Sequence, residues 1–224
     1  QCWKYGAKSI TVSHRTAAMG YDWPVNWKEV PLLNGVDGKT ARFKDGSSKA
    51  VDTIILCTGY LHNFPFMNDN LKLVTENRLA PSDLYKGIVF TRAPNLHYIG
   101  MQDQWFTFSM FDAQAWWSRD VILGKITLPS YEDMLRDVKM RMASEDSGED
   151  YSHAIRFQGD YVKELISETN YPSIDIEGAC KIFNKWQKHK KENIMTFRDK
   201  TYKSIITGSI APPHHTKWKY AMDD

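Results

Sequence analysis

The sequence predicts an α/β fold, and three observations along its 224 residues support that prediction. A short strand over residues 9–13 ends in the basic pair His14 and Arg15, as the second strand of a dinucleotide-binding unit does. The run 53–57 is continuously apolar, which is typical of a strand buried on both faces of a parallel sheet. Beyond residue 109 the apolar residues recur mainly with helical spacing, so a helical segment is expected to follow the strands.

Composition excludes several classes of protein. With 42% hydrophobic and 25% charged residues, the chain is expected to fold as a globular protein. A net charge of only +2 argues against a nucleic-acid binder, and no apolar run approaches the roughly 18 residues of a membrane-spanning helix. Cys2, Cys57 and Cys180 lie far apart, with neither metal-ligand spacing nor a disulfide framework. A reduced, cytoplasmic setting and no metal site are therefore expected.

The first 60 residues read as short strands joined by tight turns. The opening residues resemble the last turns of a helix ended by Gly6, although no Gly-rich dinucleotide loop precedes it. Asn-Gly and Asp-Gly pairs separate expected strands at 30–33, 40–43 and 51–57. Thr58 and Gly59 then turn the chain at the carboxyl end of the last strand, where open α/β sheets bind ligands.

A second strand-to-helix junction follows. Residues 87–90 and 96–100 are expected to be strands, and a loop leads from them into a helix over residues 109–123. The amino terminus of a helix carries unpaired N–H groups and the positive end of the dipole. This junction is therefore a candidate site for the polar edge of a cofactor.

The remainder is expected to be mainly helical. Ser130 and Asp133 resemble a capping box before an apolar stripe that includes Val138. A polar loop over residues 144–150 separates this helix from two others, at 161–167 and 176–193. The tail from residue 204 to residue 224 has little periodicity and is expected to wrap over another surface.

Several segments carry a family resemblance. The segment 52–60, with sequence DTIILCTGY, resembles the "ATGY" region of the flavin-containing monooxygenases, with Cys57 where many members carry Ala. Other segments keep the family's order and spacing, namely 64–66, 84–86, 94–100, 113–117 and 128–129. Finer features, at 101–105, 111–116, 197–200 and 214–216, resemble the bacterial branch that oxygenates small amines. The resemblance covers essentially the whole chain.

The resemblance implies two Rossmann-like domains in the complete enzyme, of which this chain supplies the second half. Residues 1–67 would be the remainder of the NADPH-binding domain. Residues 68–224 would be the carboxy-terminal portion of the FAD-binding domain, with a helical tail. Both Gly-rich loops would lie in an upstream half of the same protein, and the family suggests a homodimer.

The resemblance also implies a reaction. NADPH reduces FAD, O2 adds to give a C4a-hydroperoxyflavin, and trimethylamine is N-oxygenated to trimethylamine N-oxide. The flavin carries the chemistry, so no catalytic side chain is required. Two alternatives remain open: a related monooxygenase acting on sulfides or other soft nucleophiles, and a non-catalytic fragment if the chain exists alone.

By resemblance, Gln104 and Thr107 contact FAD, and His14, Arg15 and Arg198 contact NADP. The position of Gln104 and Thr107 at a helix start agrees with that role. The alternative is that Thr107 merely caps the helix. For Arg15 the alternative is a solvated surface arginine, and for Arg198 a surface ion pair.

The substrate pocket, again by resemblance, includes Trp105, Trp186 and Asp103. Aromatic faces attract cationic amines through cation–π forces. Core packing is the alternative for Trp186, because it shares a predicted apolar helix face with Ala179 and Phe183.

Two further signals are interpreted as structural. The pair His214 and His215 lacks further ligands at metal-binding spacing, and the basic run 185–191 is typical of a solvated helix face.

Overall fold

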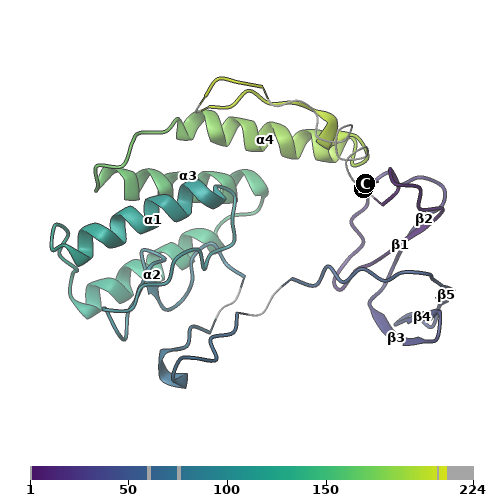
Figure 1. The fold of residues 1–224 in the computed structure, drawn as a ribbon, viewed down its shortest axis with the longest axis horizontal. Helices are drawn as coiled ribbons and strands as arrows, with labels where there is room; N and C mark the ends of the chain where they lie inside the picture. Colours follow the sequence, from purple (N-terminus) through teal and green to yellow (C-terminus); the bar gives the residue numbers. More distant parts are fainter. Residues whose placement is uncertain (1, 60–61, 75–76, 206, 211–224) are drawn as a thin grey trace, which may run out of the picture. The chain divides into compact units, whose positions relative to one another are not determined.

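A computed structural model describes residues 2–59, 62–74, 77–205 and 207–210, which form two compact units. The first unit holds the residues up to Gly59 together with 188–203 and 209–210. The second holds the described residues from 62 to 187 and the short stretch 204–208. Figure 1 shows the strands of the first unit and the four helices labelled α1 to α4. The mixed α/β composition predicted from the sequence is confirmed.

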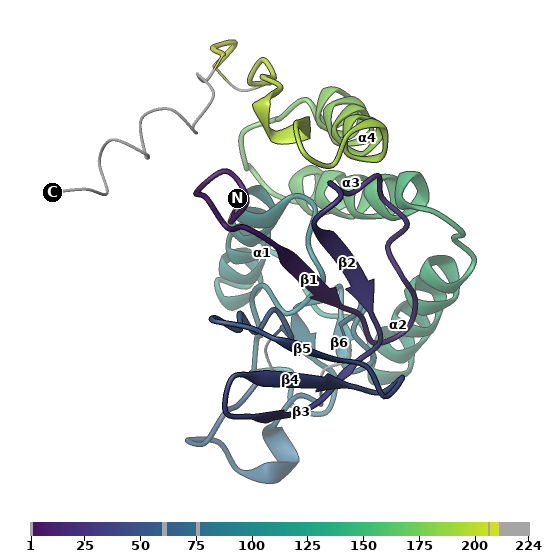
Figure 2. The same cartoon turned by 90° about the vertical axis from the view of Figure 1, so that its right-hand side faces the viewer.

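The first unit contains a parallel strand pair and an antiparallel meander (Figure 2). Strands β1 (Ile10–Ser13) and β2 (Trp27–Val30) run parallel, with Ile10 opposite Trp27. The meander consists of β3 (Leu33–Asp37), β4 (Thr40–Phe43) and β5 (Ser48–Ala50). Its two turns fall at the Asp-Gly pairs that the sequence indicated.

The predicted strand over residues 30–33 is instead a junction between two strands. Val30 ends β2 and Leu33 begins β3. Pro31 between them has no N–H to donate to a sheet, which breaks the strand. The Ser13 hydroxyl holds the break, since it donates to the Pro31 carbonyl at 3.0 Å and accepts the Leu33 N–H at 2.9 Å.

The predicted buried strand at 51–57 is wrong for this structure. These residues are irregular, and the Ile54, Ile55 and Leu56 side chains are 43%, 64% and 75% exposed. A parallel strand is stabilised by hydrogen bonds to neighbours on its edges. No described strand pairs with residues 53–57, so the apolar run has no sheet in which to be buried.

In the second unit a tight hairpin precedes the helices. Strands β6 (Leu84–Tyr85) and β7 (Val89–Phe90) are antiparallel, and their turn places Lys86 and Gly87 at φ of +48° and +63°. A Cβ atom on Gly87 would lie 2.1 Å from the side-chain nitrogen of Gln102, so only glycine fits. The strand expected at 96–100 is reduced to a single bridge between Val89 and His97.

Among the described residues, four α-helices follow the hairpin. They are α1 (Thr107–Ile122), α2 (Tyr131–Asp146), α3 (Tyr151–Ser167) and α4 (Ile176–Glu192). The predicted cap of α2 is confirmed, because the Ser130 hydroxyl accepts the Asp133 N–H. The predicted start of α3 at residue 161 is wrong. Asp150 caps this helix by accepting the His153 N–H at 2.9 Å, so the helix begins at Tyr151.

The main core of the second unit lies between α1 and α3. Met110 and Trp117 of α1 and Ile155 and Leu165 of α3 are all fully buried in one cluster. Phe106, immediately before α1, belongs to the same cluster. The start of α1 is therefore anchored to the core, and this fixes the loop that precedes it.

Candidate functional site

The loop from Gly100 to Thr107 exposes some of its side chains to solvent, while hydrogen bonds from buried side chains hold its backbone. Asp103 and Gln104 are exposed, whereas Trp105 is half-buried. The Asp103 carboxylate accepts the Gln104 N–H at 2.9 Å, which shapes the turn locally. The sequence-predicted residues Asp103, Gln104, Trp105 and Thr107 thus lie together at the start of α1.

Thr107 begins α1 in a conformation that threonine rarely adopts. Its φ is +37°, whereas a β-branched residue strongly prefers negative φ. The cap position is Phe106, which makes no side-chain capping hydrogen bond, so the alternative in which Thr107 caps the helix is wrong. Because no capping side chain is found for α1 among the described residues, N–H groups of its first turn are available to a ligand.

Aromatic rings surround Trp105. Its ring centroid lies 5.9 Å from that of Tyr151, the first residue of α3, and 6.0 Å from that of Phe183 on α4, both edge-to-face. Phe183 also contacts Phe106 at 5.3 Å. Trp186 is half-buried and lies three residues beyond Phe183, on the same face of α4. The structure therefore places α4 beside Trp105.

Buried glutamines hold the backbone of the loop. The Gln158 side chain of α3 accepts the N–H groups of Trp105 and Phe106 and donates to the Asp103 carbonyl. At the other end of the loop, the Gln114 side chain of α1 accepts the Gly100 N–H at 2.8 Å. Both glutamines are fully buried, so these hydrogen bonds are shielded from water.

A relay connects Gln114 to the β6–β7 turn. Gln114 donates to the Tyr161 hydroxyl, and that hydroxyl donates to the Lys86 carbonyl, each at 2.8 Å. Burial raises the pKa of Tyr161 to about 12, although its glutamine neighbours favour the phenolate. The hydroxyl therefore stays protonated and keeps donating at physiological pH.

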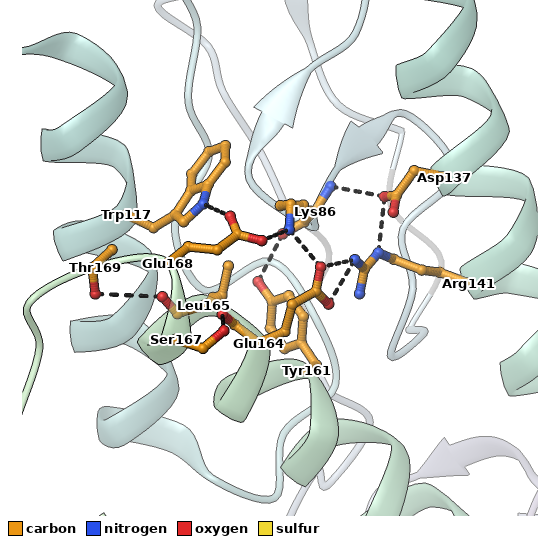
Figure 3. A network of polar contacts seen from close by, with 10 residues as sticks. All are labelled: Lys86, Trp117, Asp137, Arg141, Tyr161, Glu164, Leu165, Ser167, Glu168 and Thr169. Carbon is orange, nitrogen blue, oxygen red and sulfur yellow. Dashed lines mark hydrogen bonds and ion pairs between the residues drawn. The ribbon is translucent and has the colours of Figure 1, made fainter. Parts of the chain in front are cut away.

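Lys86 is itself the centre of an ion cluster (Figure 3). Its ammonium contacts Glu164 and Glu168, while Arg141 pairs with Glu164 and Asp137. Burial opposes the charge on Lys86, but the two glutamates outweigh it and raise the pKa of the lysine. Burial likewise opposes the charge on Glu164, and Arg141 and Lys86 together lower its pKa. Lys86 and Glu164 therefore stay ionised, and the cluster ties the hairpin to α2 and α3.

The predicted NADP-contacting residues lie in the first unit. His14 and Arg15 follow β1, and the exposed Arg15 side chain forms no ion pair with any residue that the structure describes. Arg198 lies in the short 3-10 helix Phe197–Asp199, exposed, with its guanidinium 5.1 Å from the ring of Phe197. Within the described ranges it pairs with no acid, so the alternative of a surface ion pair is not supported.

Glu29 of β2 is a residue that the sequence reading missed. Its carboxylate accepts the N–H groups of Met19 and Gly20 at 3.0 and 3.3 Å, which folds the chain after Arg15 back onto β2. Burial would raise the pKa of Glu29, but hydrogen bonds and the neighbouring His14 hold it below the usual value. Gln158 and Tyr151 were also missed, because nothing in a single sequence distinguishes them from solvated helix residues.

The described residues contain neither a metal-ligand cluster nor a helix that could span a membrane. No group of three or more His, Cys, Asp or Glu side chains among them is arranged to hold a metal ion, and His214 and His215 lie outside the described ranges. No helix among them combines the length and the apolar character needed to span a bilayer.

Comparison with known proteins agrees with the resemblance found in the sequence. Trimethylamine monooxygenases from Roseovarius sp. (strain 217) and Roseovarius nubinhibens are 65% and 61% identical to this chain over its whole length. The chain spans about half the length of these curated relatives, 50% in both cases. The predicted likeness to the amine-oxygenating bacterial branch is therefore confirmed.

Solved structures agree as well. The crystal structure of Tmm from Pelagibacter sp. strain HTCC7211 matches all of this chain and 51% of its own, with a TM-score of 0.89 and 50% identity. S-allyl-L-cysteine S-oxygenase from Allium sativum matches 86% of this chain and 46% of its own, with a TM-score of 0.65 and 28% identity.

The family described as "Flavin-binding monooxygenase-like" matches residues 30–175, more than half of the chain. This range contains the loop before α1 and its aromatic neighbour on α3. Together with the matches to trimethylamine monooxygenases, which cover all of this chain and half of each relative, it settles the family. The chain belongs to the flavin-binding monooxygenases.

Proposed function

We propose that this chain forms the carboxy-terminal part of an enzyme that uses NADPH and O2 to N-oxygenate trimethylamine to trimethylamine N-oxide. The observation that carries the proposal is the placement of Trp105, within a group of aromatic rings, beside the uncapped and strained start of α1. Trimethylamine monooxygenases match the chain over its whole length, which favours an amine as the substrate.

The start of α1 fits a flavin. Its unpaired N–H groups and dipole favour an electron-rich edge of the cofactor, and the exposed Gln104 amide can hydrogen-bond the same edge. Thr107 is the first residue of α1, and its hydroxyl is the proposed second contact to that edge. Bound FAD, reduced by NADPH, would supply the activated oxygen atom. The residues of this chain then orient the flavin and keep water away, and no side chain need act as a nucleophile.

His14, Arg15 and Arg198 fit the phosphate of NADP. An exposed arginine that pairs with no acidic residue in the described ranges is available for bidentate binding of a phosphate group. Glu29 supports the arrangement, because it holds the loop that follows Arg15.

Trp105, Trp186 and Asp103 form the proposed amine pocket. An aromatic face attracts a cationic amine by about 0.5–2 kcal/mol. The nucleophile must be the neutral amine, so the rings select and orient the substrate rather than activate it. The exposed Asp103 carboxylate adds a negative charge at the entrance that attracts protonated amines.

The upstream half of the same protein is the proposed partner of this chain. Residues 1–67 would complete the NADPH-binding domain and 68–224 the FAD-binding domain, in a homodimer. The exposed apolar run 53–57 supports this arrangement, because a strand from another segment would cover it. Cys2, Cys57 and Cys180 are free thiols, which favours a cytoplasmic setting.

Oxygenation of sulfides is the second candidate. The likeness to the Allium sativum S-oxygenase favours it, because sulfur is also a soft nucleophile. In either case the chain without its other half would be a non-catalytic fragment.

Two measurements test the proposal. The full-length protein is expected to show flavin absorption that bleaches with NADPH and recovers in air, faster with trimethylamine. In a panel of trimethylamine, a dialkyl sulfide and a ketone, the amine is expected to give the highest kcat/KM. A higher kcat/KM for the sulfide would favour sulfur oxygenation instead. If no substrate accelerates the recovery of oxidised flavin in air, both proposals are refuted.

Trp105→Ala separates the amine pocket from the NADPH site. The variant is expected to lose about tenfold or more in kcat/KM for trimethylamine, while flavin reduction by NADPH is retained. Unchanged amine turnover would remove Trp105 from the proposed pocket.

A further inference from the structure

Gln158 pairs with three backbone groups of the loop before α1, those of Asp103, Trp105 and Phe106. It lies on α3 and is only 1% exposed. Its Oε1 accepts the N–H groups of Trp105 and Phe106, the latter at 2.9 Å, and its Nε2 donates to the Asp103 carbonyl at 2.6 Å. Because Oε1 accepts two hydrogen bonds and Nε2 donates one, the orientation of the amide is fixed.

This side chain makes the irregular loop possible at a buried place. Backbone N–H and C=O groups left unpaired away from water are costly, and no helix or sheet pairs these three. Among the uncharged side chains only glutamine and asparagine offer both a donor and an acceptor of this kind. Glutamine also has the reach to cross from α3 to the loop.

The surroundings bring α3 close enough for these bonds. The next residue is Gly159, where a Cβ atom would lie 2.7 Å from the Cys180 sulfur and 3.4 Å from the Phe106 ring. Glycine therefore lets α3 approach both α4 and the loop. Tyr151 at the start of α3 contacts the Trp105 ring as well, so one helix touches both the backbone and the side chain of Trp105.

We propose that Gln158 is a positioning residue for the amine pocket. By fixing the Trp105 backbone, it keeps the indole between Tyr151 and Phe183 and holds Asp103 at the exposed edge of the loop. This inference rests on the proposed function. Gln158 acts on the substrate through Trp105. It does not affect the proposed NADP-contacting residues, which lie in the other unit.

The test compares three variants of the flavin-loaded, full-length enzyme. Gln158→Met keeps the size but removes every hydrogen bond. Gln158→Glu keeps an acceptor for the two N–H groups, but it loses the donor to the Asp103 carbonyl and adds a buried carboxyl group. Val162→Ala, in the same helix and equally buried, is the matched control for lost stability. For each variant the KM and kcat for trimethylamine and the rate of flavin reduction by NADPH are measured, per bound flavin.

Gln158→Met is expected to raise the KM for trimethylamine by about ten- to a hundredfold, since a small misplacement of a binding group is costly. Flavin reduction by NADPH is expected to change by less than about twofold. Gln158→Glu is expected to fall between wild type and Gln158→Met, and Val162→Ala to match wild type in both quantities. If Gln158→Met does not retain flavin, the positioning role is tested by comparing the KM for trimethylamine of Gln158→Glu with that of Val162→Ala.

The outcomes separate the two proposals. A wild-type enzyme without amine-dependent NADPH oxidation overturns the proposed function and this inference with it. A wild type that oxygenates trimethylamine, with Gln158 variants that match Val162→Ala, overturns the positioning role alone. Equal losses in the amine and NADPH steps would likewise reduce Gln158 to a general structural residue and overturn the inference.

Discussion

Thr107 shows at the scale of a single residue how stability and binding can compete. Its positive φ at the first residue of α1 is a conformation that costs a non-glycine residue about 1–3 kcal/mol. Such strain is concentrated at ligand-binding positions, where the side chain is needed for another purpose. The proposed hydrogen bond from the Thr107 hydroxyl to the flavin would account for the strain at this residue.

Thr107→Gly is predicted to leave the flavin-free protein as stable as wild type or more stable by up to about 1 kcal/mol, because relief of strain outweighs the entropy of glycine. The same variant is predicted to bind FAD more weakly. Urea unfolding and flavin titration measure the two effects. Thr107→Ser is the control, since it keeps the hydroxyl and should keep the affinity. Equal affinity of Thr107→Gly and wild type would contradict a role for that hydroxyl.

Tyr161 gives a residue-scale prediction at high pH. Burial raises its pKa from 10.0 to about 12, so the folded state holds the proton more tightly than the unfolded state. The stabilisation is therefore complete below pH 10 and is lost as the pH rises towards 12. Tyr161→Phe is predicted to be less stable at pH 7, by about 1–3 kcal/mol, because the Lys86 carbonyl and Gln114 lose a partner.

The measurement is the free energy of unfolding between pH 9 and pH 12 for both proteins, an interval chosen to bracket the tyrosine pKa values of about 10 to 12. The difference between wild type and Tyr161→Phe should shrink across it. A constant difference would mean that the buried hydroxyl is not what loses its proton.

Residue roles were predictable where local sequence determines them. Gln104 and Thr107 follow a strand signal and precede a helix, so their position at a helix start could be predicted. Gln158 could not, because its hydrogen bonds join residues more than fifty positions apart. A buried glutamine and a solvated one look alike in a helical sequence, and only the packing of α3 against the loop distinguishes them.

At the scale of elements, charged residues join the β6–β7 hairpin to α2 and α3. Lys86 is 6% exposed and contacts two glutamates, whose side chains are about one-third exposed. Removal of one partner from a buried ion cluster leaves uncompensated charge. Because the partly exposed glutamates can recover water, the loss should be smaller than for a fully buried pair.

Lys86→Met is accordingly predicted to lower the free energy of unfolding by about 2 kcal/mol at pH 7. It should also raise the pKa of Glu164, because one of the two cations that lower it is gone. The stabilisation from Glu164 is present above its usual pKa of 4.5 and is lost as the pH falls through its lower folded value. In the variant that loss should be smaller and should be complete at a higher pH.

Acid titrations of stability check this prediction. Lys139→Met on α2 is the control, because Lys139 is exposed and forms no ion pair within the described part of the chain. Its acid-unfolding midpoint should match wild type, whereas that of Lys86→Met should move upwards. Identical midpoints for both variants would show that the cluster does not govern acid stability.

Elements were predictable in proportion to how local their signals are. The cap at Ser130 fixed the start of α2, and the periodicity of α4 gave its range to within one residue of Glu192. The start of α3 was missed, because Asp150 lies in an acidic stretch that also suits a loop. The strand predicted at 53–57 was wrong for a different reason, since such a strand depends on neighbouring strands, and no described strand pairs with these residues.

At the scale of the whole molecule, the exposed apolar run 53–57 is the feature whose burial most requires another segment. Ile55 and Leu56 are more than half exposed, although fully burying an aliphatic side chain of this size contributes about 1.5–3 kcal/mol. The chain spans about half the length of its curated relatives. A strand that pairs with 53–57 is therefore expected from the proposed upstream half.

Leu56→Asp tests this expectation in two contexts. In this chain alone the variant should change stability by less than about 0.5 kcal/mol, as surface substitutions do. In the full-length protein it should cost about 3 kcal/mol or more, because the charge would be buried in a sheet. Val36→Asp is the control, since Val36 on β3 is 50% exposed and should tolerate the change in both contexts. If Leu56→Asp is neutral in both, the run 53–57 stays exposed in the full-length protein, and the upstream half must meet this chain elsewhere.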